Sequence, residues 1–430
     1  MTATDVGYEQ VRAWVKVRLQ QTHATVVQTI AWAVLRVLVS QRVTPAALAR
    51  ALPAEQSGSG RARLTRVRRW WAGPVLDQAV VSPQLVAGAL TLLAPGQAVV
   101  VALDTTRLGK WEVWLAGIVV AGRTVPIGWA AIPYPWPKGR FRATTLTLIR
   151  QLQAAFPVGR RWSLVADRGF PSAALFAQLR QNGTDFSIRV RLSDWVTVAG
   201  VYAKVADHLV AGRLRPGQRT AATIGRGRPN QPCVTGWVVV STTVAALPRH
   251  KRNLGTLRER AQRAKAHRQH RLHKQGRNTK PPSATAQRYA QTWVLFTTAP
   301  TVRQAVGEYA QRMPIEETFR DWHHGWGVRT AVSNLPTEAM VERLIGVVCL
   351  AYSLQLQLGQ RLSREPAGQQ RRAQWTVTDR VSWFWCGQRL FADPGYDWRA
   401  WVAAQWPALI QVRVPTPARA FPFPLLAEAA

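Results

Sequence analysis

Residues 98–106 read AVVVALDTT, an apolar, valine-rich run that ends in one aspartate and two threonines. A continuous run of this kind predicts a central β-strand buried on both faces. Residues 161–167, RWSLVAD, form a second such run and also end in an aspartate. We therefore place Asp104 and Asp167 at the C-terminal ends of two strands, where α/β sheets bind their ligands.

The segments around these strands predict a mixed sheet flanked by helices, which is an α/β fold. Further strand-like runs lie at residues 113–122, 123–133 and 185–192. Apolar residues at helical spacing follow at residues 144–156 and 171–183. Several adjacent strands followed by alternating strand and helix are typical of a sheet with helices packed on its faces.

The charge of the chain indicates a polyanionic partner. Among 430 residues, Lys and Arg number 57 against 22 Asp and Glu, a formal charge of +35. The positive charge is spread along the whole chain, which favours nucleic acid as the partner. Attachment to a membrane surface and the arginine-rich drift of a high-GC genome are the two alternatives.

The N-terminal residues 1–90 predict an all-helical domain. Apolar residues recur at helical spacing from Tyr8 to Ser40, and Thr44 with Pro45 provides a helix start. The following segment, LTRVRRWW, carries Arg68 and Arg69, which we expect to contact DNA. An amphipathic bundle with a solvated basic face is the alternative.

Residues 195–288 predict a β-rich insertion with a basic arm at 249–280. The arm has one acidic residue, Glu259, and many basic ones. We expect it to bind DNA phosphates, with an inert linker as the alternative. Its candidate DNA-binding residues are Arg258, Arg263, Lys265 and Arg268.

Cysteine spacing and hydropathy predict a soluble protein of the cytoplasm, associated with the nucleoid. Cys233, Cys349 and Cys386 show neither a disulfide framework nor zinc-site spacing, which fits a reducing compartment. No signal peptide is evident at the N-terminus. The best membrane-span candidate, Leu344–Tyr352, is too short to cross a bilayer and is interpreted as part of a buried helix.

Acidic residues are scarce, so their positions are informative. A buried, ionised carboxylate is costly unless it is paired or binds a metal, and oxygen ligands suit Mg²⁺ or Mn²⁺. Two such ions can activate a water or a 3′-hydroxyl and stabilise the leaving oxygen of a phosphodiester. A third carboxylate would complete the site, and the downstream candidates are Glu308, Glu316, Glu317 and Asp321.

Residues 309–323, YAQRMPIEETFRDWH, contain three of these candidates. Pro314 disfavours helical geometry at the preceding Met313, so a helix is expected to begin at the proline with Glu316 in its first turn. Apolar positions 315, 319 and 322 share the face expected to pack on the sheet. On a regular helix, Glu316 and His323 fall within about 20° of each other.

This segment resembles the Tyr-x2-Arg-x3-Glu-x6-Lys signature of bacterial cut-and-paste insertion-sequence transposases of the DDE class. VALDTT and VADRGF likewise resemble that family's first and second aspartate motifs. A long interval precedes the glutamate, as it does in the family, where the interval holds a mostly β insertion domain. The resemblance covers about Val99 to Ile345.

The resemblance implies a ribonuclease-H-like core that cleaves transposon ends and joins them to target DNA. Asp104, Asp167 and Glu316 would be the catalytic residues and would bind two Mg²⁺ ions, with Mn²⁺ as a substitute. The residues expected to contact DNA near the site are Tyr309, Arg312, Arg168 and His323. The partners would be double-stranded DNA and a second copy of the chain in a synaptic complex.

The resemblance also implies a domain order. The core would comprise residues 91–194 and 289–362, interrupted by the insertion. The C-terminal region, residues 363–430, lies outside the resemblance, and we expect it either to mediate dimerisation or to cap the core. An aromatic residue of the insertion would stack on a flipped-out base. Trp195 and Trp237 are candidates, although a core role is the expected one for each.

One residue departs from the signature, because His323 stands where the family has lysine. A neutral imidazole can hydrogen-bond to phosphate but lacks the fixed charge of lysine. An inactive or domesticated DNA-binding descendant and a related metal-dependent nuclease remain alternatives. A chromatin-like architectural protein is a third, although it would not need a large apolar sheet.

Overall fold

The computed structural model describes residues 3–19, 23–50, 59–71, 73, 76–225, 232–241, 292–375, 382–393 and 397–410. The chain divides into two compact units. Unit 1 comprises residues 1–166, 178–185 and 310–430, and unit 2 comprises residues 167–177 and 186–309.

Unit 1 is built on a four-stranded mixed sheet with the order β3-β2-β1-β4. Its strands are β1 (Val100–Leu108), β2 (Trp111–Val120), β3 (Arg123–Pro133) and β4 (Ser163–Ala166). β1 pairs in parallel with β4 and antiparallel with β2, and β2 pairs antiparallel with β3. The apolar runs found in the sequence are therefore strands, as expected, and the mixed sheet is consistent with a ribonuclease-H-like fold.

Helices cover both faces of this sheet because successive residues of a strand point to opposite sides. On β3, Gly128 lies against Leu148 and Leu152 of α7 (Arg140–Ala155). The next residue, Trp129, is fully buried and lies against Gly346 of α15 (Glu338–Arg364). A side chain at either glycine would meet these neighbours, so the two glycines allow the helices to approach closely.

The helix α15 is the core helix of unit 1. It contains Leu344–Tyr352, which is buried as expected, but the helix is 27 residues long and therefore much longer than that stretch. Among the described residues it is the one helix long and apolar enough to cross a membrane, although 83% of its apolar window is buried. Length and composition are weak support for a membrane span, since the core helix of a soluble protein has the same properties.

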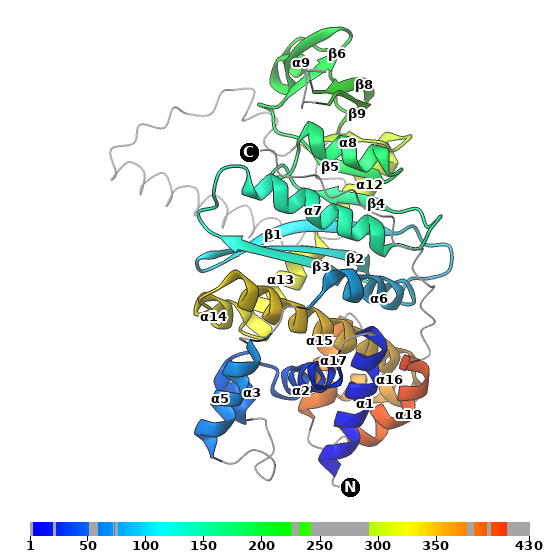
Figure 1. Cartoon of the computed structure of the whole chain (residues 1–430). Coiled ribbons are helices and arrows are strands. Elements are labelled where there is room, and N and C mark those ends of the chain that lie inside the picture. The colour runs from blue at the N-terminus through cyan, green and yellow to red at the C-terminus, as the bar shows by residue number, and fades with distance from the viewer. Residues whose placement is uncertain are drawn as a thin grey trace, which may run out of the picture. The chain divides into compact units, whose positions relative to one another are not determined.

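Further helices pack on the side of α15 that faces away from the sheet (Figure 1). They are α1 (Ala3–Arg18), α2 (Ala24–Ser40), α16 (Pro366–Trp375), α17 (Trp383–Ala392) and α18 (Trp398–Ile410). Two smaller helices, α3 (Pro45–Arg50) and α5 (Gly60–Trp71), contact each other, and α6 (Gln78–Leu90) contacts α7 and β3. The hydroxyl of Thr44 accepts a hydrogen bond from the Ala47 N–H, so the expected cap of α3 is present.

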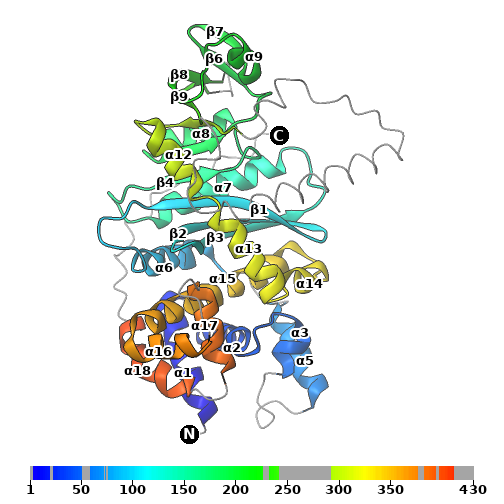
Figure 2. The same ribbon diagram turned by 180° about the vertical axis from the view of Figure 1, so that it is seen from behind.

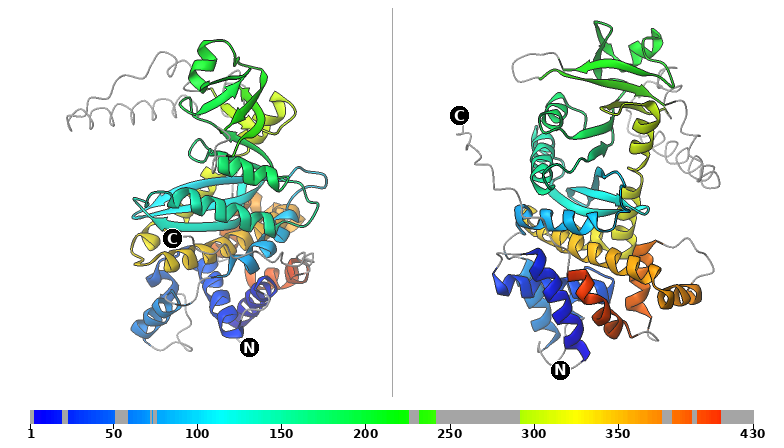
Figure 3. Two further views of the ribbon diagram at one scale, coloured as in Figure 1. Left: turned by 45° about the horizontal axis from the view of Figure 1, so that its top comes forward. Right: turned by 90° about the vertical axis from the view of Figure 1, so that its right-hand side faces the viewer.

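Unit 2 is dominated by antiparallel strands in the order β5-β10-β9-β8-β6-β7. They are β5 (Asp185–Arg189), β6 (Trp195–Val198), β7 (Val201–Lys204), β8 (Arg219–Ile224), β9 (Val234–Val240) and β10 (Val294–Thr297). The short helix α9 (Val205–Val210) lies beside β6 and β7 (Figure 3). The remaining described helices before residue 311 are α8 (Ala173–Gln181) and α12 (Val302–Ala310).

Three short elements connect α12 to α15. They are α13 (Pro314–Arg320), a π-helical turn η2 (Asp321–Gly325) and α14 (Val328–Ser333). α13 contacts β1, β2 and β3, and α14 contacts β1 (Figure 2). This stretch therefore lies against the strand that carries Asp104.

Candidate active site

Asp104 lies inside a strand and not at its end, so the expected placement was wrong for this residue. β1 continues through Leu108, because its second half pairs with β2 from Asp104↔Leu115 to Leu108↔Trp111. The parallel pairing of β1 with β4 stops earlier, at Leu103↔Ala166. Asp104 is thus the first residue of β1 beyond the β4 ladder, and its carboxylate also accepts a hydrogen bond from the Thr105 N–H.

Asp167 directly follows the last residue of β4, as expected. Its Oδ1 atom accepts hydrogen bonds from the Arg168 N–H at 2.7 Å and from the Tyr309 hydroxyl at 3.4 Å. Tyr309 is buried and its ring packs edge-on against Trp293. Tyr309 therefore helps to orient Asp167. The side chain of Arg168 is exposed, while its carbonyl accepts a hydrogen bond from Arg191.

The helix α13 begins at Pro314 and has Glu316 in its first turn, as the sequence predicted. Met313 nevertheless has helical backbone angles (φ −55°, ψ −36°), contrary to expectation. The apolar face is confirmed, because Ile315, Phe319 and Trp322 are all buried. Burial of this face leaves Glu316 on the opposite, exposed side of the helix.

Arg312 joins Asp104 to Glu316. One guanidinium nitrogen lies 2.6 Å from Asp104 Oδ2, and the other lies 2.6 Å from Glu316 Oε1. The Arg312 side chain is 9% exposed, that of Asp104 18% and that of Glu316 46%. The two carboxylates therefore share one buried cation through charge-assisted hydrogen bonds, although Glu316 itself stays partly exposed to solvent.

The other acidic candidates have different partners. Glu317 pairs with Arg320 on the helix surface, as is common for residues three apart on a helix. Glu308 accepts hydrogen bonds from Ser187 and Gln304. Glu316 is thus the acidic residue of this segment that shares a cation with Asp104.

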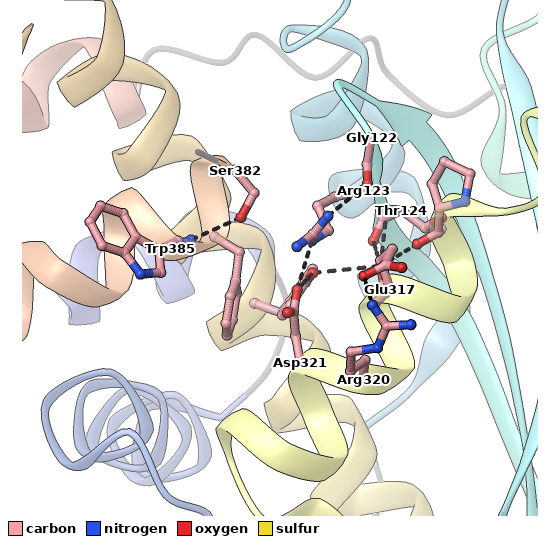
Figure 4. Close-up of polar contacts among 12 residues, drawn as sticks. Gly122, Arg123, Thr124, Glu317, Arg320, Asp321, Ser382 and Trp385 are labelled. Carbon is pink, nitrogen blue, oxygen red and sulfur yellow. Dashed lines mark hydrogen bonds and ion pairs between the residues drawn. The ribbon is translucent and has the colours of Figure 1, made fainter. Parts of the chain in front are cut away.

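A buried polar network holds α13 and η2 against the sheet (Figure 4). Arg123 Nε donates to Asp321 Oδ2 at 2.8 Å, and the hydroxyl of the buried Tyr352 donates to the same oxygen at 2.8 Å. The Thr124 N–H donates to the Thr318 hydroxyl at 3.0 Å. Burial raises the pKa of Asp321, and the neighbouring Arg123 opposes that shift. These contacts fix the helix that carries Glu316.

His323 lies on the π-helical turn η2, so the angle taken from a regular helical wheel does not apply between Glu316 and His323. The Trp326 N–H bonds to the Asp321 carbonyl, five residues back, which unwinds the helix relative to a regular α-helix. His323 Nε2 instead lies 3.2 Å from the Thr106 hydroxyl. Burial lowers the pKa of His323, and Arg329 and His324 lower it further, which favours the neutral imidazole.

Asp104 and Thr106 are two residues apart on β1 and therefore point to the same face of the sheet. Arg312 contacts the first of them and His323 the second. The imidazole is thus half-buried against the strand, where it bonds to a neutral hydroxyl. His323 therefore differs from the lysine of the family signature, which would carry a fixed positive charge on an extended side chain.

The remaining DNA-binding candidates are separate from this group or outside the described residues. Arg68 and Arg69 are exposed in the last turn of α5. The basic arm lies outside the described residues, and with it Arg258, Arg263, Lys265 and Arg268.

The two aromatic candidates of the insertion have different environments. Trp195 is 42% exposed and stacks on Tyr202, so the expected core role was wrong for it. Its position as the first residue of β6 explains the exposure. Trp237 is half-buried, with the Arg219 guanidinium 3.8 Å from its ring centroid.

The donor chemistry suits a hard divalent cation, because Asp104, Asp167 and Glu316 all offer carboxylate oxygens. Among the residues that the structure describes, no three acidic, histidine or cysteine side chains form a ready metal cluster. Between Asp104 and Glu316, positive charge is supplied by Arg312. A metal that bridges these two carboxylates would have to compete with the guanidinium.

Sequence reasoning missed the residues that position α13. Arg123 and Thr124 open β3, and Tyr352 lies within the apolar stretch of α15. Their contacts with Asp321 and Thr318 span long intervals of sequence. No local pattern marks such partners, since periodicity shows only which face of an element is buried.

Residues 141–354 match the family model described as the transposase DDE domain. No curated protein matches the chain. The family match supports a DDE transposase and implies binding to DNA. The matched residues include Asp167, Tyr309, Arg312 and Glu316, whereas Asp104 precedes them. The link between Asp104 and the matched segment is its ion pair with Arg312.

Proposed function

We propose that this chain is a DNA transposase that binds terminal inverted repeats, cleaves the DNA and joins the ends to target DNA. The observation that carries the proposal is the shared contact of Arg312 with Asp104 and Glu316. It joins the first aspartate motif to the signature helix, within a chain whose residues 141–354 match the transposase DDE domain.

In this proposal Asp104, Asp167 and Glu316 would hold two Mg²⁺ ions, with Mn²⁺ as a substitute. Bound metal would activate the attacking water or 3′-hydroxyl and stabilise the leaving oxygen. The register of the strands supports the pairing of the aspartates. Leu103 and Ala166 are partners in the parallel ladder, and each aspartate is the next residue of its chain segment.

The protein's own residues would bind and orient the DNA backbone. Arg312 would exchange its carboxylate partners for a DNA phosphate, since a guanidinium binds carboxylate and phosphate with the same geometry. Tyr309 would hold Asp167 in place, and the exposed Arg168 would contact a phosphate nearby. His323 would hold η2 against β1 through its hydrogen bond with Thr106. If its ring contacts a phosphate, it would do so as a neutral imidazole, through a hydrogen bond and not through a positive charge.

The partners and location follow from the same proposal. Transposon ends and target DNA would be bound as double strands by the helical N-terminal residues 1–90, including Arg68 and Arg69, and by the basic arm. The synaptic complex would contain two copies of the chain, with residues 363–430 as the candidate dimerisation region. The protein would act in the cytoplasm on nucleoid DNA.

The test is cleavage and strand transfer of DNA that carries the element's own terminal repeats, in Mg²⁺. Asp104→Ala, Asp167→Ala and Glu316→Gln should each abolish cleavage while DNA binding is retained. Glu317→Gln is the matched control, because Glu317 lies on the same helix and forms an ion pair with Arg320. Cleavage without joining would indicate a nuclease, and full activity of any one of the three variants would refute the proposed site.

A further inference from the structure

A second group of residues in unit 1 combines an exposed tryptophan with basic side chains. Trp136 follows β3 and is 39% exposed. Its ring contacts those of Tyr134 and Phe141, at centroid distances of 5.1 and 5.2 Å. Phe141 in turn packs on Trp114, which is fully buried. Trp136 is therefore the outermost ring of a row anchored in the core.

Basic residues surround this ring. The Arg107 guanidinium lies 3.6 Å from the centroid of Tyr134, and the Tyr134 N–H donates to the Lys110 carbonyl at 2.7 Å. These contacts bring the β1–β2 turn to the segment that follows β3. Lys110, Lys138 and Arg142 are all exposed. We call Arg107, Lys110, Tyr134, Trp136, Lys138 and Arg142 the Trp136 surface.

Little negative charge offsets these cations. Residues 113–166 contain no Asp or Glu. Of the acidic residues beside this stretch, Glu112 is buried on β2, and Glu338 pairs with Arg140 at 2.8 Å. Such an excess of exposed cations is unfavourable unless an anion binds to it.

The surface lies at the end of the sheet toward which β1 runs. Arg107 is three residues beyond Asp104 on β1, which corresponds to about 10 Å along a strand. β3 runs in the same direction as β1, because both are antiparallel to β2. Because successive residues of a strand point to opposite faces, Arg107 and Asp104 lie on opposite faces of the sheet, so this surface would contact DNA separately from the site at Asp104.

We propose that the Trp136 surface binds a DNA strand with at least one unpaired base, which stacks on Trp136 while Arg107 and Arg142 contact its phosphates. Exposed aromatic rings among cations are the physical basis for binding single strands, because every base has a face that can stack. The Tyr134–Trp136–Phe141 row holds the indole in place before the strand arrives. This inference rests on the proposed function only in taking DNA as the partner.

The test compares two fluorescein-labelled DNAs in EDTA, a blunt duplex and the same duplex with a single-stranded thymidine tail. Fluorescence anisotropy would give the affinity of each for the full-length protein. Trp136→Ala should weaken binding of the tailed DNA by about tenfold and that of the blunt duplex by less than about twofold. Trp136→Phe should lie between, since a smaller ring still stacks.

The matched control is Val158→Ala, because Val158 is an exposed apolar residue of the same unit, at 84% exposure. It should leave both affinities unchanged. Arg107→Ala combined with Arg142→Ala should reduce the salt dependence of tailed-DNA binding by about two phosphate contacts. The inference would be overturned if Trp136→Ala lost affinity equally for both DNAs or lost affinity for neither. It would also be overturned if Trp136→Ala disrupted only the self-association of the protein.

The assay separates this inference from the proposed function. It uses no metal and measures no cleavage, so loss of the catalytic assignment would leave its outcome unchanged. Conversely, Trp136→Ala could bind both DNAs normally in a protein whose cleavage still depends on Asp104. That result would reject the Trp136 surface and leave the transposase proposal standing.

Discussion

Replacing Arg312 with glutamine should make the protein less stable without metal and more responsive to metal. Arg312 bridges Asp104 and Glu316 at 2.6 Å each, and its side chain is 9% exposed. Removing one partner of a fully buried ion pair costs about 3–5 kcal/mol. Because the carboxylates here are 18% and 46% exposed, we reduce this to about 2–3 kcal/mol.

The expected result is a melting temperature in EDTA that is lower by about 2–5 °C in Arg312→Gln. Mn²⁺ should restore much of this loss, because a metal at 100 times its dissociation constant stabilises the folded state by about 2.7 kcal/mol. In the unmodified protein the metal must first displace the guanidinium, so the Mn²⁺-induced shift should be smaller. Differential scanning fluorimetry with and without Mn²⁺ measures both quantities.

Arg320→Gln is the control for this experiment. Arg320 pairs with Glu317 on the same helix, but its side chain is 62% exposed. Pairs of this kind contribute about 0–1 kcal/mol, so the variant should melt close to the unmodified protein at either metal level. An Arg312→Gln variant with unchanged stability in EDTA, or with the same Mn²⁺ shift as the unmodified protein, would refute the reasoning.

Three further perturbations test other parts of the structure. The pKa of His323 is lowered on folding, so the contribution of this residue to stability should be fully present above about pH 6.5 and should be lost as the pH falls through the folded-state pKa. Between pH 7 and 5, His323→Gln should therefore lose less stability than the unmodified protein. Equal losses would contradict this. Tyr352→Phe removes a hydroxyl that donates to Asp321, so chemical denaturation should show a loss of about 1.5–3 kcal/mol; no loss would show that the bond does not hold η2. Deleting the basic arm, residues 249–280, should weaken DNA binding and flatten its salt dependence, whereas an unchanged salt slope would show that the arm is inert.

The strands and the start of the glutamate helix could be predicted because their signals are local. Continuous valine-rich runs indicate strands buried on both faces, and β1 and β4 have that composition. Pro314 fixes the first residue of α13, which places Glu316 in the first turn. Neither prediction required knowledge of a distant partner.

The end of β1 and the orientation of His323 could not be predicted because distant partners determine them. β1 extends past Asp104 only because β2 pairs with it. The π-helical turn accompanies burial of Trp326, whose indole N–H donates to Gln41 at 2.8 Å. A helical wheel assumes a regular helix and contains neither contact.

Strand transfer by the purified protein on DNA bearing the element's terminal repeats is the most direct test of the central claim. We predict joined products that require Mg²⁺ or Mn²⁺, and that disappear in Asp104→Ala, Asp167→Ala and Glu316→Gln but persist in Glu317→Gln. Joined products in EDTA, or undiminished products from any of the three carboxylate variants, would contradict the claim.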